Sequence, residues 1–150
     1  MVMTKEEFEE QIANGQMLEH AEYCGKYYGT PSSQIMDWIE EGRDVVLEIE
    51  VQGARQIKEK RPDCVSIFVL PPSLEELEKR LRYRNTEDEE TIQKRLAVAR
   101  QEMETARDYD YVIVNDTIEH TVEQINKIIA AEKLKVSRAK SNIERVLNND

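Results

Sequence analysis

The chain alternates short apolar runs with longer amphipathic segments, and this alternation constrains its fold more than any other feature. The runs are DVVLEIE (Asp44 to Glu50), CVSIFVL (Cys64 to Leu70) and YVIV (Tyr111 to Val114). Consecutive apolar residues in such runs are typical of strands that are buried on both faces, as in a parallel sheet. Strands that alternate with helices predict an α/β fold with a parallel sheet.

The segments between the runs carry signals for helix starts. A Ser, Thr or Asp followed three residues later by Glu predicts a helix N-terminus. This pattern occurs at Thr4, Ser73, Thr86 and Asp116. A further helix is expected after Pro31, and another from Gly53 to Lys60. Residues 17–28 are expected to form a hairpin that turns at Gly25-Lys26, and the polar tail from Val136 is expected to fray.

Charge and composition exclude several classes of protein. The formal net charge of the 150 residues is -10, which disfavours nucleic-acid binding because such proteins normally present a basic face. No apolar run is long enough to span a membrane. Cys24 and Cys64 have no clustered histidines beside them, so we expect no zinc or other protein-bound metal site. Two thiols in an acidic chain indicate a reducing, cytoplasmic location.

Two carboxylates lie at the C-terminal end of the first apolar run. Glu48 and Glu50 are two residues apart, so on a strand both side chains point to the same face. Open α/β sheets bind ligands at the carboxyl ends of their strands. The pair could hold Mg²⁺ through water or accept hydrogen bonds from a sugar or a base. The same spacing also fits a charged strand end that faces solvent.

Three arginines lie on the two helices that follow Pro71-Pro72. Arg80 and Arg84 are four residues apart and share a helix face, and Arg95 lies on the next helix. Converging guanidiniums would clamp a phosphate group, because each offers a planar fork of donors. From spacing alone, ordinary surface pairing such as Glu76 with Arg80 is the favoured interpretation.

A third set of polar residues precedes Pro31. The carboxylate of Glu19 could accept two parallel hydrogen bonds from the edge of guanine. The phenol of Tyr28 could donate to a phosphate oxygen, and the hydroxyl of Thr30 to a carbonyl. Without further information, the favoured interpretation is a surface Glu, a packing Tyr and a turn Thr.

Taken together, these segments resemble the guanylate kinase family. The resemblance rests on LEHAEYCGKYYGTP, DVVLEIEVQGARQIK, IFVLPPSLEELEKRLRYRNTEDEETIQKRL and YDYVIVND. These stretches cover nearly the whole chain in the family's order and spacing. The resemblance implies an enzyme that transfers a phosphate from ATP to GMP, with Mg²⁺ as the cofactor that accompanies ATP.

The resemblance also implies roles for the residues already named. Glu19 and Thr30 would read the guanine, and Tyr28 would bind the GMP phosphate. Glu48 and Glu50 would lie beneath the nucleotides, near the ribose, base and magnesium. The three arginines, Arg80, Arg84 and Arg95, would close on ATP and stabilise the transferring phosphoryl group. A further residue, Asn115, would lie near the adenine.

The domain organisation follows from the same resemblance. Residues 1–43 would form a partial GMP-binding lobe, 44–72 core sheet, 73–107 a helical lid, and 108–150 core sheet with a C-terminal helix. In the family a strand and a P-loop of the form G-x-x-x-x-G-K-[ST] precede these segments. No such motif occurs in the 150 residues, and Asn85 stands where the family usually has Gly.

The lack of a P-loop motif leads to two expectations. We expect the 150 residues alone to be catalytically incompetent, because P-loop amides and lysine cradle the ATP phosphates. We also expect self-association, because the strands on either side of the P-loop strand would have unpaired edges. The alternative function is a non-catalytic guanylate-kinase-like module that binds a protein partner.

Overall fold

The structure is a computed structural model that describes residues 4–15, 17–23, 26–84 and 87–148. The chain divides into two compact units, residues 1–66 and 67–150, each described by itself below. None of the helices in the described ranges has the length and apolar character that crossing a membrane requires. The α/β class predicted from the sequence is confirmed, and the sheet formed by the second unit is parallel.

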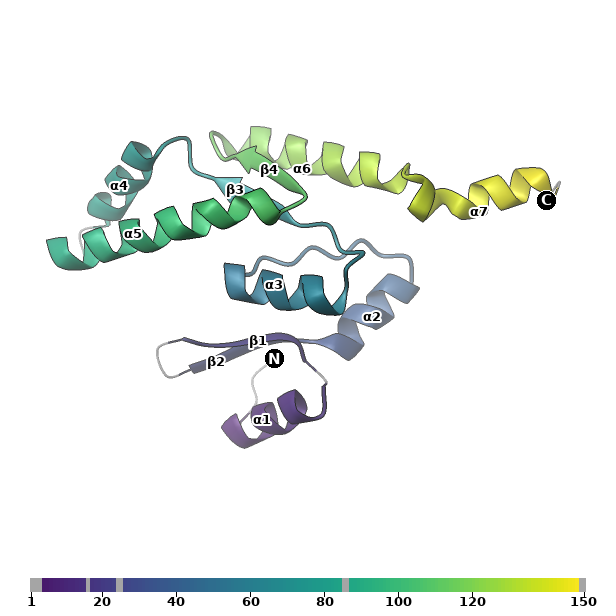
Figure 1. The fold of residues 1–150 in the computed structure, drawn as a ribbon, viewed down its shortest axis with the longest axis horizontal. Helices are drawn as coiled ribbons and strands as arrows, with labels where there is room; N and C mark the ends of the chain where they lie inside the picture. Colours follow the sequence, from purple (N-terminus) through teal and green to yellow (C-terminus); the bar gives the residue numbers. More distant parts are fainter. Residues whose placement is uncertain (1–3, 16, 24–25, 85–86, 149–150) are drawn as a thin grey trace. The chain divides into compact units, whose positions relative to one another are not determined.

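The first unit is built around an antiparallel hairpin (Figure 1). Its strands are β1 (Met17–Tyr23) and β2 (Lys26–Pro31). Helices α1 (Lys5–Ala13) and α3 (Val51–Lys60) lie on opposite sides of this hairpin, and both contact β1. The predicted turn falls partly on Cys24 and Gly25, which are outside the described residues.

Local capping explains where α1 begins and ends. The Thr4 hydroxyl accepts from the Glu7 backbone N–H at 3.2 Å, and the Glu7 carboxylate accepts from the Thr4 N–H at 2.9 Å. This reciprocal pair confirms the predicted capping box. The helix stops at Asn14, and Gly15 follows with φ +68°, a conformation that costs glycine little.

Helix α2 (Ser32–Glu40) follows Pro31 as predicted and packs with α3 over the core of this unit. Ile35 and Ile57 are the buried residues at its centre. The residues packed against them are only partly buried: Trp38, Val45, Leu47, Ile49 and Cys64.

The predicted strand from Asp44 to Glu50 is wrong. No strand is assigned anywhere in residues 43–50, although Val45, Leu47 and Ile49 face the core and alternate with exposed residues. Val46 is 72% exposed, so the segment is buried on one side only. A run of β-branched residues favours an extended backbone, but a strand also needs a neighbour for its hydrogen bonds.

In the second unit, β3 (Ile67–Leu70) pairs in parallel with β4 (Tyr111–Val114). Ile67 lies opposite Tyr111 and Leu70 opposite Val114, so both strands end at the same edge. The predicted bounds of β4 are confirmed, whereas β3 begins three residues later than the predicted start at Cys64. The rings of Phe68 and Tyr109 meet edge to face, with centroids 5.1 Å apart.

Two helices connect these strands. Helix α4 (Leu74–Tyr83) begins at Ser73, whose hydroxyl accepts from the Glu76 N–H at 3.0 Å as predicted. Helix α5 (Glu89–Thr105) lies beside it and ends in a short 3-10 turn, η1 (Ala106–Asp108). The predicted cap of α5, Thr86, lies outside the described residues, and the structure assigns that role to Asp88.

The C-terminal part is helical throughout its described length. Helix α6 (Ile118–Lys133) is capped by Thr117 rather than by the predicted Asp116, and α7 (Val136–Leu147) follows it. The expectation that the tail from Val136 frays is therefore wrong. Its sequence places apolar residues on one stripe, which favours an amphipathic helix over a disordered tail.

A buried carboxylate fixes the junction between α6 and α7. Glu132 is 6% exposed and accepts from Lys135 Nζ at 2.8 Å, from Tyr111 Oη at 2.6 Å and from Arg138 Nε at 3.3 Å. These donors, Lys135 first, lower the pKa of Glu132. The charged form of Glu132 therefore stabilises the fold at neutral pH, and this contribution is lost as the pH falls through its lowered pKa.

Candidate nucleotide site

The hairpin brings the three predicted guanosine-site residues together by its register. Glu19 lies opposite Thr30, and Ala21 lies opposite Tyr28. Opposed residues and residues two apart on a strand share one face of the ladder. The backbone therefore places Glu19, Tyr28 and Thr30 at positions on the same face. The side chains of Glu19 and Tyr28 themselves lie outside the described part of the structure.

One contact holds this hairpin to α3. The Lys60 ammonium, at the end of α3, donates to the Met17 carbonyl at 2.5 Å. Met17 is only 1% exposed, so the start of β1 is a fixed point of the first unit. The residues that follow on β1, including Glu19, are thus carried by a strand anchored at its beginning.

Glu48 and Glu50 occupy different environments although both are exposed. Glu50 is the N-cap of α3, where one carboxylate oxygen accepts from the Gln52 N–H at 2.9 Å and the other from the Gly53 N–H at 2.6 Å. Both residues fall on the exposed side of the extended segment, as their spacing predicts. Glu50 nevertheless has a structural task that sequence reasoning missed, although a Glu directly before a helix start is a usable signal.

This difference predicts different costs for removing the two carboxylates. We expect Glu50→Ala to lower the free energy of unfolding by about 1 kcal/mol, because the first N–H groups of α3 lose their acceptor. Glu48→Ala serves as the matched control and should change it by less than about 0.5 kcal/mol. Urea denaturation followed by circular dichroism measures both. Equal effects of the two substitutions would contradict the capping role.

The arginines lie on the exposed surfaces of α4 and α5. Arg80 pairs with Glu76 at 3.7 Å, the surface pairing that the spacing also allowed, and Arg95 pairs with Glu87. Arg84 is the C-cap of α4, and the described part of the structure shows no ion pair for it. All three guanidiniums are therefore accessible to an anionic ligand. Their convergence on one point stays a prediction.

Asn115 lies where the two parallel strands end. Its backbone N–H donates to the Leu70 carbonyl at 2.8 Å, and its side-chain carbonyl accepts from Thr121 Oγ1 at 3.0 Å. These bonds fix the side chain at the carboxyl edge of the β3–β4 pair. Ligands of open α/β sheets bind at such edges.

A resident metal site is not evident among the described residues, where no three His, Cys, Asp or Glu side chains are placed to share an ion. Magnesium that arrives with a nucleotide needs less, because it keeps several waters and phosphate oxygens and takes only one or two carboxylates. The exposed carboxylate of Glu48 fits this demand, whereas both oxygens of Glu50 already accept backbone N–H groups.

These features define a class. A parallel α/β sheet with polar residues at its carboxyl edge, together with an arginine-bearing helix pair, is the arrangement of a phosphate-ligand enzyme of the nucleoside monophosphate kinase type. Comparison with known proteins makes the class specific, because a profile of the guanylate kinase family matches residues 1–132.

Individual relatives agree with the profile. A guanylate kinase of Lactococcus lactis subsp. lactis (strain IL1403) is 52% identical over 145 residues, which is 97% of this chain and 69% of the relative. One from Oceanobacillus iheyensis is 48% identical over 146 residues, covering 97% and 71%. The crystal structure of guanylate kinase from Anaplasma phagocytophilum superposes with a TM-score of 0.73 at 38% identity. It covers 91% of this chain, which spans 66% of that structure. The chain belongs to the guanylate kinase family.

Proposed function

We propose that this chain supplies the GMP-reading surface and the phosphate-clamping helices of an enzyme that transfers a phosphate from ATP to GMP. The observation that carries the proposal is the hairpin register, which places Glu19, Tyr28 and Thr30 on one face. The names of the relatives support the same reaction. The division into a GMP-binding lobe (1–43), core sheet (44–72 and 108–150) and helical lid (73–107) belongs to this proposal.

The residues on the hairpin read the acceptor nucleotide. Glu19 accepts hydrogen bonds from the N1–H and 2-amino groups of guanine, both of which adenine lacks. Thr30 donates to the guanine carbonyl, and Tyr28 donates to the GMP phosphate. Glu48 and Glu50 lie toward the ribose and the base. A carboxylate and a hydroxyl at positions on one face of the hairpin can thus select guanine without any contact to the reacting phosphate.

The residues of the second unit act on the transferring phosphate. Arg80, Arg84 and Arg95 neutralise negative charge on the phosphates and stabilise the transition state. Asn115 holds the adenine end of ATP. Magnesium bound with ATP would supply charge neutralisation at the phosphates, and the exposed carboxylate of Glu48 would hold its water shell.

Nucleotide selectivity tests the proposal. We expect the chain to bind GMP more tightly than AMP, because AMP leaves the Glu19 carboxylate without its two donors. Losing such a partner costs about 1–3 kcal/mol, or roughly 5- to 150-fold in Kd. Titration calorimetry on the chain and on Glu19→Gln measures the difference, and the variant should lose most of the preference.

A matched control is available on the same strand. Glu22 lies opposite Tyr27, so the register places it on the other face of the hairpin from Glu19. Glu22→Gln should leave the preference for GMP unchanged. Equal affinity for GMP and AMP in the unsubstituted chain, or an equal effect of both substitutions, would contradict the assignment of Glu19.

We also propose that the chain self-associates. The support is apolar surface on α7, where Val136, Val146 and Leu147 are 65%, 73% and 75% exposed. Light scattering at two protein concentrations should show a mass above that of the monomer, increasing with concentration. A monomeric mass at both concentrations, with cooperative thermal unfolding, would contradict self-association. Cys64 forms no disulfide bond within the described residues, which supports a reducing, cytoplasmic location.

A further inference from the structure

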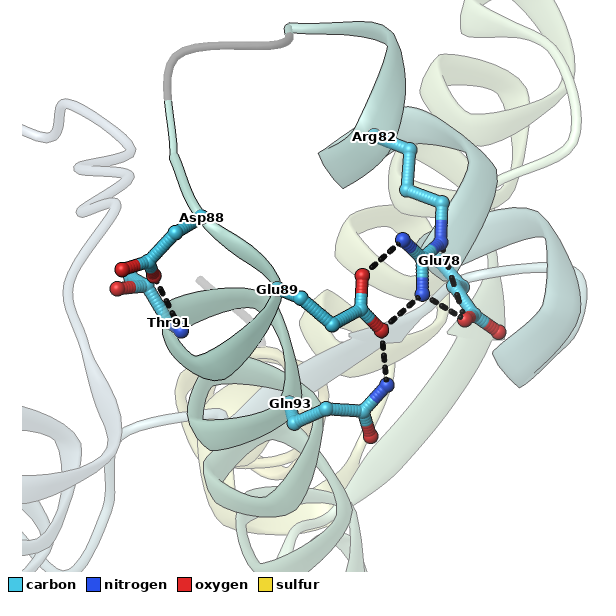
Figure 2. A network of polar contacts seen from close by, with 6 residues as sticks. All are labelled: Glu78, Arg82, Asp88, Glu89, Thr91 and Gln93. Carbon is cyan, nitrogen blue, oxygen red and sulfur yellow. Dashed lines mark hydrogen bonds and ion pairs between the residues drawn. The ribbon is translucent and has the colours of Figure 1, made fainter.

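A bidentate ion pair joins the two arginine-bearing helices (Figure 2). Arg82 on α4 donates from Nη1 to Glu89 Oε2 at 2.5 Å and from Nη2 to Glu89 Oε1 at 2.7 Å. Glu89 is the first residue of α5 and seven positions away from Arg82 in the sequence. The contact therefore connects the end of one helix to the start of the next.

Neighbouring side chains hold both partners in this orientation. Glu78, one turn before Arg82 on α4, accepts from Arg82 Nη2 at 2.8 Å and from Nε at 3.2 Å. Gln93, one turn into α5, donates to Glu89 Oε1 at 3.0 Å. Figure 2 shows the four side chains in this order, with Arg82 between the two carboxylates. We call these four residues the α4–α5 bracket.

The chemistry of the bracket differs from that of the other arginines nearby. A guanidinium has five N–H donors, and carboxylates occupy four of those of Arg82. Arg82 is therefore poorly placed to bind phosphate. Donation from Arg82, and then from Gln93, lowers the pKa of Glu89 to about 2. The carboxylate consequently stays charged at any pH at which the protein would be assayed.

Fully buried side chains are rare on the two helices in the described part of the structure. Helix α4 has no buried residue, and Ile92 is the single buried residue of α5. Isolated exposed ion pairs contribute little, but bidentate geometry within a network is the exception. The half-buried side chains of Leu77 and Leu81 on α4 add apolar burial, and the bracket adds a directional constraint between α4 and α5.

We propose that Arg82 is a positioning residue that holds α4 and α5 at a fixed angle and so sets where Arg95 lies relative to Arg80 and Arg84. The consequence for catalysis rests on the proposed function of those three arginines. Arg82 itself does not touch the nucleotide. Its loss would misplace the phosphate ligands, and such misplacement can cost on the order of 10²-fold in rate.

The first arm of the experiment measures the helix arrangement directly in the 150-residue chain. Spin labels are attached to cysteines at Tyr83 on α4 and Val98 on α5, which are 92% and 51% exposed, after Cys24 and Cys64 are changed to Ser. Pulsed electron resonance then gives the distribution of distances. We expect one narrow distribution, which broadens or shifts in Arg82→Met and in Glu89→Gln. Arg82→Lys keeps the positive charge but loses the bidentate guanidinium. Its distance distribution should therefore lie between those of the unsubstituted chain and Arg82→Met.

A matched control separates the bracket from general charge effects. Glu75→Gln removes one carboxylate of an exposed ion pair within α4, with Lys79 at 3.7 Å, and Glu75 is not a member of the bracket. It should leave the distribution close to that of the unsubstituted chain. Circular dichroism confirms that each variant is folded. An unchanged distribution in both Arg82→Met and Glu89→Gln would overturn the proposal.

The second arm measures turnover in the chain extended by a P-loop segment, as described in the Discussion. Arg82→Met should lower kcat by about 10- to 100-fold and leave KM for GMP nearly unchanged, because the hairpin that reads GMP is intact. Glu75→Gln should stay within about twofold, since exposed pairs within one helix contribute little. A changed distance distribution with an unchanged kcat would overturn the positioning role. If the unsubstituted extended chain has no activity, the proposed function fails, and the distance measurement alone then decides whether the bracket sets the helix angle.

Discussion

Joining a P-loop segment to this chain is expected to raise GMP-dependent ADP release by at least about 10³-fold over the 150 residues alone. The segment would be the strand and the P-loop, of the form G-x-x-x-x-G-K-[ST], that the resemblance to the guanylate kinase family implies, placed before Met1. Phosphoryl transfer depends on positioning and on charge neutralisation rather than on covalent chemistry. The P-loop amides and lysine supply both for ATP, and no motif of this kind occurs in the 150 residues.

A coupled assay for ADP, with ATP, GMP and magnesium, measures this increase. One control replaces the P-loop lysine of the added segment by Met, and a second replaces GMP by AMP. Both should return the rate to that of the 150 residues. Robust GMP-dependent turnover by the 150 residues themselves would show that the P-loop is not required. A folded extended chain that binds GMP but has no turnover would favour a non-catalytic binding module.

The second large effect is expected from Arg84→Met in the same extended chain. We expect kcat to fall by about 10³- to 10⁵-fold, the range found for arginines that stabilise transferring phosphoryl groups. Arg84 is the C-cap of α4 and is exposed, so its guanidinium is available to a phosphate. KM for GMP should change little, because the interaction is made with the transferring group.

Arg100 provides the matched control for this substitution. It is an exposed arginine on α5 to which no role is assigned, and Arg100→Met should change kcat by no more than about twofold. Steady-state kinetics at varied ATP and GMP concentrations separate kcat from KM. If Arg84→Met raises KM for ATP and leaves kcat unchanged, Arg84 binds the ground state and does not stabilise the transition state.

Features that depend on neighbouring residues could be predicted from the sequence. The capping box of Thr4 and Glu7 and the cap at Ser73 were both predicted and are confirmed. So were the hairpin and the bounds of β4. Each of these rests on hydrogen bonds within a few residues or on one apolar run between turn signals, and such interactions are encoded locally.

Features that depend on a distant partner could not be predicted in this way. Residues 43–50 have the composition of a buried strand, yet no strand is assigned to them, because pairing requires a second strand beside them. The helical state of α7 could have been predicted from its apolar stripe, but the junction before it could not, because Glu132 draws a donor from Tyr111, 21 residues away.

The candidate site divides in the same way. Glu19, Thr30 and the arginines were nominated by the resemblance of the sequence to the guanylate kinase family, since residue type and spacing alone favoured ordinary surface roles. The register that places Glu19 opposite Thr30 follows from hairpin pairing, and the bracket of Arg82 with Glu89 follows from how two helices meet. The seven residues from Arg82 to Glu89 span the break between two helices, so the periodicity of a single helix does not say whether these two side chains meet. Only the tertiary structure could therefore show that Arg82 binds Glu89, whereas Arg84 is exposed. The physical reason is that the partner of Arg82 lies on another helix, and the packing of the two helices determines which side chains meet.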